Sequence, residues 1–149
     1  MTEMGLHMKR PCLAVADLPK ALSIYRDILG FRLDYESEAS PTSYLYPVFK
    51  LPPEAKLKFA ALSTESEPRA LTLTEVKGIP LPPPTVPHRA AIVLRVPEVA
   101  TVIQKLSQLG LEIIAPNTFD APPNLKLKEQ AFWDYDRHLI VLYEVKTTS

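Results

Sequence analysis

The sequence predicts an α+β fold in which one βαβββ module occurs twice. Three observations lead to this prediction. A strand followed by a capped amphipathic helix occupies residues 13–30, the same order of elements returns at residues 90–110, and strand-like stretches follow each helix. A sheet that buries one face against a helix satisfies both apolar patterns at once. We therefore expect two small sheets, each with its own helix.

The first module begins with a short strand and a helix. Leu13 and Val15 lie two residues apart, as on one face of a strand. Asp17 is a favourable N-cap, and Pro19 falls in the first turn, where proline is tolerated. Apolar residues then recur at three- and four-residue spacing: Leu18, Ala21, Leu22, Tyr25, Ile28 and Leu29. Gly30 follows the last of them, in the usual position of a residue that ends a helix.

Four more strand-like stretches complete the first module. Residues 31–36 alternate apolar and polar side chains, and the stretches 43–51, 57–63 and 70–76 are rich in apolar and β-branched residues. The sequence therefore predicts about three strands after the helix, and the strand-like residues 43–51 also belong to a segment between strands, where binding loops tend to lie.

The second module repeats this order of elements. Residues 90–96 form the predicted strand, and the helix has one apolar stripe: Val99, Val102, Ile103, Leu106 and Leu109. Aligning the two segments with a one-residue gap places Asp17 on Glu98 and Gly30 on Gly110, an internal repeat of about 80 residues. A strand is predicted at 111–114, and two more at 125–134 and 138–145.

Proline separates the modules. The chain has 16 prolines and only four glycines, and many of the prolines cluster in runs predicted to be loops, at residues 51–56, 78–87 and 115–124. We expect residues 1–78 to form the first module, 79–88 a stiff proline-rich linker, and 89–149 the second module, within one compact domain.

Composition excludes several classes of protein. Lysine plus arginine equals aspartate plus glutamate at 17 each, so no basic excess favours nucleic acid as a partner. No apolar run is long enough to span a bilayer, and the single cysteine, Cys12, cannot form an internal disulfide. No glycine-rich phosphate-binding motif is present. We expect a cytoplasmic protein with no membrane partner.

Two motifs resemble those of a known superfamily. The stretch VADLPKALSIYRDILGF (15–31) resembles the opening segment of the vicinal oxygen chelate superfamily. That group includes glyoxalase I, extradiol dioxygenases, and the fosfomycin and bleomycin resistance proteins. The stretch FWDYDRHLIVLYE (132–144) resembles the family's closing hairpin, with Tyr135, Arg137 and Val141 in place of its proline, glycine and glutamate. The resemblance implies two modules whose curved mixed sheets form a cup, and a homodimer.

The resemblance also implies where metal ligands would lie. Metal-dependent members carry histidine, glutamate or glutamine at four positions on the concave wall of the cup. The corresponding residues here are Arg10, Thr72, Ala91 and Val141. Arginine stays protonated and cannot ligate a cation. We therefore expect no metal cofactor, although two of His7, His88 and His138 with Glu75 or Glu144 could form a relocated site.

Strand parity predicts which other side chains face the cup. If Leu13 and Val15 face the helix, then Arg10 and Cys12 face the cup, and by the same argument so does Arg95. The two arginines either bind a carboxylate or phosphate group or pair with acidic residues. Cys12 and the pair Asp134 and Asp136 are candidates for catalysis, but a small thiol and a hairpin turn explain them without chemistry. The candidate ligand-binding residues are Arg10, Tyr44, Tyr46, Phe59, Thr72, Arg95, Trp133 and Val141.

Three functions are consistent with this pattern. The favoured hypothesis is a glyoxalase/bleomycin-resistance-like protein that lacks the usual metal ligands and binds a small organic molecule in the cup, with an anionic molecule as one option. The alternative is a divergent lyase, isomerase or dioxygenase with a relocated or absent metal. The third is a structural or regulatory module whose cup is filled by side chains. Fold analogy alone does not transmit an activity.

Overall fold

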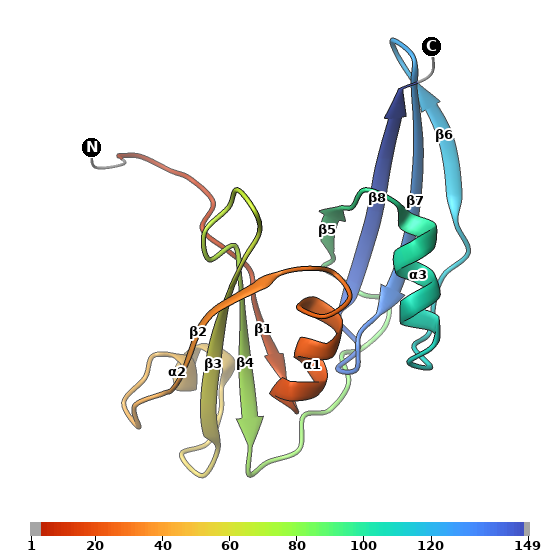
Figure 1. Ribbon diagram of the computed structural model, residues 1–149. Helices are drawn as coiled ribbons and strands as arrows, with labels where there is room; N and C mark the ends of the chain where they lie inside the picture. Colours follow the sequence, from red (N-terminus) through yellow and green to blue (C-terminus); the bar gives the residue numbers. More distant parts are fainter. Residues whose placement is uncertain (1–3, 148–149) are drawn as a thin grey trace.

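A computed structural model describes residues 4–147 and contains two four-stranded mixed sheets (Figure 1). The first has the order β1-β4-β3-β2, and the second β5-β8-β7-β6. In each sheet the first strand pairs in parallel with the last, and the other pairs are antiparallel. The strands are β1 (Cys12–Val15), β2 (Arg32–Glu38), β3 (Lys56–Ser63), β4 (Leu71–Lys77), β5 (Ile92–Arg95), β6 (Asn117–Ala121), β7 (Leu125–Trp133) and β8 (Leu139–Thr147). The predicted α+β fold of two βαβββ modules is confirmed.

One helix covers one face of each sheet. α1 (Leu18–Tyr25) packs on the first sheet and α3 (Val99–Ser107) on the second (Figure 1). The side chains of both layers join in a single hydrophobic cluster. Val15, Leu73, Leu106, Phe132 and Ile140 are fully buried in it. Burial of side chains of this size is the main source of stability for a chain of this length. No helix among residues 4–147 is long and apolar enough to cross a membrane.

The opposite face of each sheet, which points away from α1 or α3, is called the distal face below. On the first sheet it carries Cys12, Ala14, Phe59, Ala61, Thr72 and Thr74. On the second it carries Val93, Arg95, Ala131, Trp133, Val141 and Tyr143. The side chains of Leu13, Val15, Ile92, Leu94 and Val96 join the helix-side cluster. The predicted parity of the two first strands is therefore confirmed.

The ends of the helices follow the predicted signals. Asp17 caps α1, because its Oδ1 accepts the Lys20 backbone N–H at 3.0 Å. Gly30 and Gly110 adopt φ values of 95° and 77°, which glycine reaches without steric strain. Both helices end earlier than the apolar stripe suggested, and the last stripe residues lie in the turns before these glycines.

Residues 43–51 have a strand-like sequence but form no strand. They contain a short helix, α2 (Leu45–Phe49), which packs on the distal face of the first sheet. The hydroxyl of Ser43 accepts the Leu45 backbone N–H at 3.2 Å and favours a turn. Pro47 has no N–H to give to a strand ladder but is tolerated in the first turn of a helix.

The strand predicted at 111–114 does not form, so this prediction is wrong. Only Ile113 forms an isolated bridge there, with Phe132, and the edge strand β6 lies in a stretch that its flanking prolines had marked as loop. Pro116 and Pro122 stand just outside β6, where a proline removes no ladder hydrogen bond. The ends of β6 therefore depend on the positions of the flanking prolines rather than on their number.

The two modules meet at two junctions. At the closed junction, the β7–β8 turn (134–138) bonds to the first module: Asp134 accepts the Tyr25 hydroxyl at 2.7 Å, Asp136 accepts the Ala16 N–H at 2.8 Å, and His138 Nε2 lies 2.7 Å from the Ala14 carbonyl. At the open junction, the β3–β4 turn (64–70) faces β5 across two adjoining cavities of about 370 and 250 Å³. Both cavities are lined by Phe31, Thr64, Leu94 and Arg95.

Candidate functional site

The four positions where the resemblance would place metal ligands have side chains that do not suit a divalent cation. Thr72 donates its hydroxyl to Cys12 Sγ at 2.9 Å, and Val141 lies between Val93 and Ala131 on the second distal face. Arg10 and Ala91 stand just before β1 and β5. Divalent metals need carboxylate, imidazole, thiolate or carbonyl donors. One engaged hydroxyl, two aliphatic groups and a guanidinium do not supply them.

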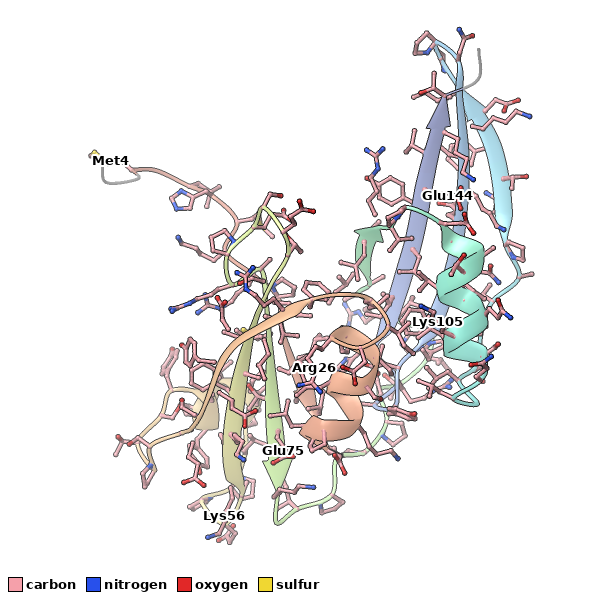
Figure 2. The ribbon with its side chains drawn as sticks, viewed as in Figure 1. Met4, Arg26, Lys56, Glu75, Lys105 and Glu144 are labelled. Atoms are coloured by element: carbon pink, nitrogen blue, oxygen red, sulfur yellow. The ribbon has the colours of Figure 1, made fainter. Side chains whose placement is uncertain are left out.

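The two glutamates of the relocated-metal alternative hold helices instead. Figure 2 shows Glu75 at the start of α1 and Glu144 at the start of α3. The Leu18 N–H donates to Glu75 Oε2 at 2.7 Å, and the Val99 N–H donates to Glu144 Oε1 at 2.8 Å. Each carboxylate thus satisfies a free N–H at a positive helix end. Both lie on the helix side of their sheets and cannot join a metal site on a distal face.

Charge around Glu144 reinforces this role. The Val99 N–H, together with Lys146 at 3.2 Å, holds the pKa of the Glu144 carboxyl below its ordinary value. Within residues 4–147, no group of three or more histidine, cysteine, aspartate or glutamate side chains is placed to hold a metal ion.

Asp134 and Asp136 belong to the closed junction. Asp134 is buried and also accepts the backbone N–H groups of Asp136 and His138, as predicted for a hairpin turn. Asp136 instead bonds across the junction to Ala16. Burial, followed by the charge of Asp134, raises the pKa of the Tyr25 hydroxyl well above its ordinary value, and burial raises the pKa of Asp136. These acids join the two modules.

The aromatic candidates of the first module separate into two regions. Tyr44 is 80% exposed beside α2, whereas Tyr46 donates its hydroxyl to the Ala55 carbonyl at 2.8 Å and lines a cavity of about 500 Å³. Phe59 lies on the distal face, edge-on to Tyr35 at 5.5 Å between ring centres. Phe59 is therefore the aromatic candidate that shares a face with Thr72.

Among the described residues, no acid pairs with either arginine of the sequence prediction. Within residues 4–147, Arg10 and Arg95 have no carboxylate within 4.0 Å. Arg10 is exposed before β1, and Arg95 lines both cavities of the open junction. Of the two alternatives for these residues, pairing with acidic side chains is not observed.

Trp133 is the centre of a cluster that includes residues the sequence prediction missed. Its indole N–H donates to His88 Nε2 at 2.6 Å, and the Arg137 guanidinium lies 4.9 Å above its ring. A cavity of about 250 Å³ lies beside this cluster, lined by Pro84, Thr85, His88, Arg89, Ala90, Arg137, His138 and Leu139. The sequence signal consists of two basic dipeptides, His88-Arg89 and Arg137-His138, which lie far apart in the chain.

The structure thus brings together only part of the predicted set. Phe59 and Thr72 share the first distal face, and Arg95, Trp133 and Val141 share the second. Tyr46 packs on another part of the first distal face, whereas Arg10 and Tyr44 are exposed. Ligand binding by any of the eight residues stays a prediction.

Comparison with known proteins identifies the fold family. The model of the Glyoxalase/Bleomycin resistance protein/Dioxygenase superfamily matches residues 7–140. No curated protein sequence matches the chain.

Solved structures agree with this match. A glyoxalase family protein from Bacillus cereus is 16% identical with a TM-score of 0.71, and the alignment covers 96% of each chain. A genomically encoded fosfomycin resistance protein from Listeria monocytogenes, complexed with Mn(II) and sulfate, is 20% identical with a TM-score of 0.61, covering 95% of this chain and 93% of that one. An antibiotic binding protein from Streptomyces is 18% identical with a TM-score of 0.58, covering 97% and 100%. At these identities the likeness concerns the fold.

Proposed function

Because the chain belongs to the Glyoxalase/Bleomycin resistance protein/Dioxygenase superfamily, we propose that it binds a small organic molecule on its distal faces without a resident divalent metal. The observation that carries this proposal is the chemistry of Arg10, Thr72, Ala91 and Val141 at the four ligand positions. A further support is that Glu75 and Glu144 are used to start helices.

The distal face of the second sheet has the character of a small-molecule surface. Val93 is 60% exposed, and Val141, Tyr143 and Trp133 are only half-buried. Exposed apolar side chains next to a few polar groups are typical of ligand sites. A bound molecule would cover this apolar surface and gain the free energy of its burial.

The similar structures include a metal-containing protein and a protein that binds a small molecule. One similar structure contains Mn(II), and another is an antibiotic binding protein. The side chains at the four ligand positions of this chain favour binding of a small molecule over metal-dependent chemistry. We further propose that the protein works as a homodimer, which sedimentation velocity would test.

Thermal denaturation of EDTA-treated protein against a library of metabolites and antibiotics tests the binding proposal. A ligand should raise the melting temperature in proportion to the logarithm of its concentration. Val141→Trp should block the second distal face and abolish the shift, whereas Val48→Trp, at a 53% exposed position on α2, should leave it unchanged.

Two results would refute the proposal. One is a divalent ion held at one per chain and needed for ligand binding. The other is a library without any ligand that shifts the melting temperature.

A further inference from the structure

We propose that the cavity beside Trp133 is an anion pocket that binds a small tetrahedral dianion, such as the phosphate or phosphonate group of a ligand. The inference rests on the proposed function and deepens it by naming a chemical group of the bound molecule. The pocket is defined by His88, Arg89, Arg137 and His138, which come from the segment just before β5 and from the β7–β8 turn.

Every ionisable side chain that lines this pocket is basic. Four other cavities among residues 4–147 mix charges: for example, Glu67 shares a cavity with Arg95, and Glu75 shares one with lysines. Two guanidinium groups remain protonated at any physiological pH and match the geometry of tetrahedral oxyanions. A dianion would neutralise both, whereas a monoanion would leave one unpaired.

The hydrogen-bond partners of the two imidazoles determine which of their ring nitrogens donates and which accepts. An indole N–H can only donate, so His88 Nε2 accepts from Trp133 and a neutral ring carries its proton on Nδ1. A carbonyl can only accept, so His138 Nε2 donates to Ala14 and carries a proton. His88 thus keeps an N–H donor that Trp133 does not use.

The acids near the pocket already have partners. Asp134 accepts from Tyr25 and the turn backbone, and Asp136 accepts from Ala16 while facing His138. Glu112 lies 3.4 Å from Arg137, but both side chains are exposed, and such a pair is weak. An incoming dianion can therefore compete for Arg137.

Arg137 is also held in an unusual backbone conformation. Its φ of 67° lies in the left-handed region, where a residue with a Cβ is disfavoured. Strained residues of this kind concentrate at functional sites. Stacking on Trp133 fixes the guanidinium beside the pocket, and the ring connects the pocket to the second distal face. The body of a ligand would extend along that face.

Titration calorimetry with inorganic phosphate on the full chain tests the inference. Arg137→Gly removes the guanidinium and relieves the positive φ, so the variant should fold and bind phosphate at least tenfold more weakly. Arg89→Gln should have a similar effect. The matched control is Arg69→Gly, because Arg69 has a φ of 49° and lies 4.7 Å above the Tyr35 ring in the first module.

The results separate this inference from the proposed function. Absence of phosphate binding, equal binding by the Arg137→Gly and Arg69→Gly variants, or equally tight binding of acetate would overturn the dianion pocket. A library ligand without an anionic group, insensitive to Arg89→Gln but lost in Val141→Trp, would support the proposed function and refute the pocket. Phosphate binding by a protein for which no distal-face ligand is found would support the pocket and refute the proposed function.

Discussion

The two modules repeat the same elements, but their corresponding turns are used differently. At the β3–β4 turn, polar contacts stay within the first module: Asp34 of β2 accepts the Ser63 hydroxyl at 2.8 Å and lies 3.8 Å from Arg69 of the turn. In the β7–β8 turn, the equivalent polar groups bond to the other module and form the closed junction. Duplication thus preserved the elements and their helix anchors, whereas the contacts between modules became unequal.

The largest predicted effect is at Asp134. Asp134→Ala would leave the buried Tyr25 hydroxyl and two turn N–H groups without an acceptor, at about 3 kcal/mol of unfolding free energy. Urea denaturation measures it. Asp34→Ala, in β2 beside the β3–β4 turn, should produce a clearly smaller loss, and equal losses would mean that the two turns do not differ in the way described.

The helix anchors test whether the modules are otherwise equivalent. Glu75→Ala and Glu144→Ala should each destabilise by about 1–2 kcal/mol, because each leaves a helix N–H unpaired. Since the pKa of Glu144 is lowered, its stabilisation is present above its ordinary value of 4.5 and is lost as pH falls through the folded value. The penalty of Glu144→Ala should therefore shrink in acid. A pH-independent penalty would contradict this.

Tyr25→Phe removes one bond of the closed junction and should destabilise by about 1 kcal/mol. The pKa of Tyr25 is raised, so its contribution is complete below its ordinary value of 10.0 and is lost as pH rises through the folded value. Above pH 10 the wild type should lose stability more steeply than the variant, as followed by circular dichroism. Parallel alkaline profiles would refute the assignment.

Asp136→Asn should have a small and opposite effect. The amide oxygen can still accept the Ala16 N–H, and the raised pKa means that burial opposes the charged carboxylate. With a raised pKa, the stabilisation is present below the ordinary value of 3.8 and lost as pH rises through the folded value. We expect a gain of about 0.5 kcal/mol at neutral pH that disappears in acid. A loss of unfolding free energy above about 1 kcal/mol at neutral pH would exceed the usual effect of a surface substitution and would show that the charge is needed.

The smallest effect is expected at the open junction. Arg95→Ala should change the unfolding free energy by less than about 0.5 kcal/mol, because Arg95 has no acidic partner among the described residues. Chemical denaturation of this variant beside Asp134→Ala compares the two junctions directly. A loss approaching that of Asp134→Ala would show that the open junction also holds the modules together.

Local patterns in the sequence predicted most of the fold. The caps at Asp17 and Gly30, the helix stripes and the strand parity depend on residues a few positions apart, so they can be found in a single sequence. The prediction missed α2 and β6, where the exact place of Pro47 or Pro116 decides between helix, strand and loop.

The pocket could not be predicted for a different reason. His88 and Trp133 are 45 residues apart, and His138 reaches Ala14 across 124. Nothing local in the segment before β5 or in the β7–β8 turn indicates that Arg89 and Arg137 will line one cavity. Only the way in which the two modules pack brings these basic residues together.

The closed junction has a consequence for how the chain is made. Its three bonds join residues 109 to 124 positions apart, and the later partner in each belongs to the β7–β8 turn. Since a chain is synthesised from its N-terminus and domains fold as they emerge, the first module leaves the ribosome before Asp134 can accept the Tyr25 hydroxyl. Until then this edge of the newly made module remains hydrated and accessible to chaperones, and translation of the β7–β8 hairpin allows it to close.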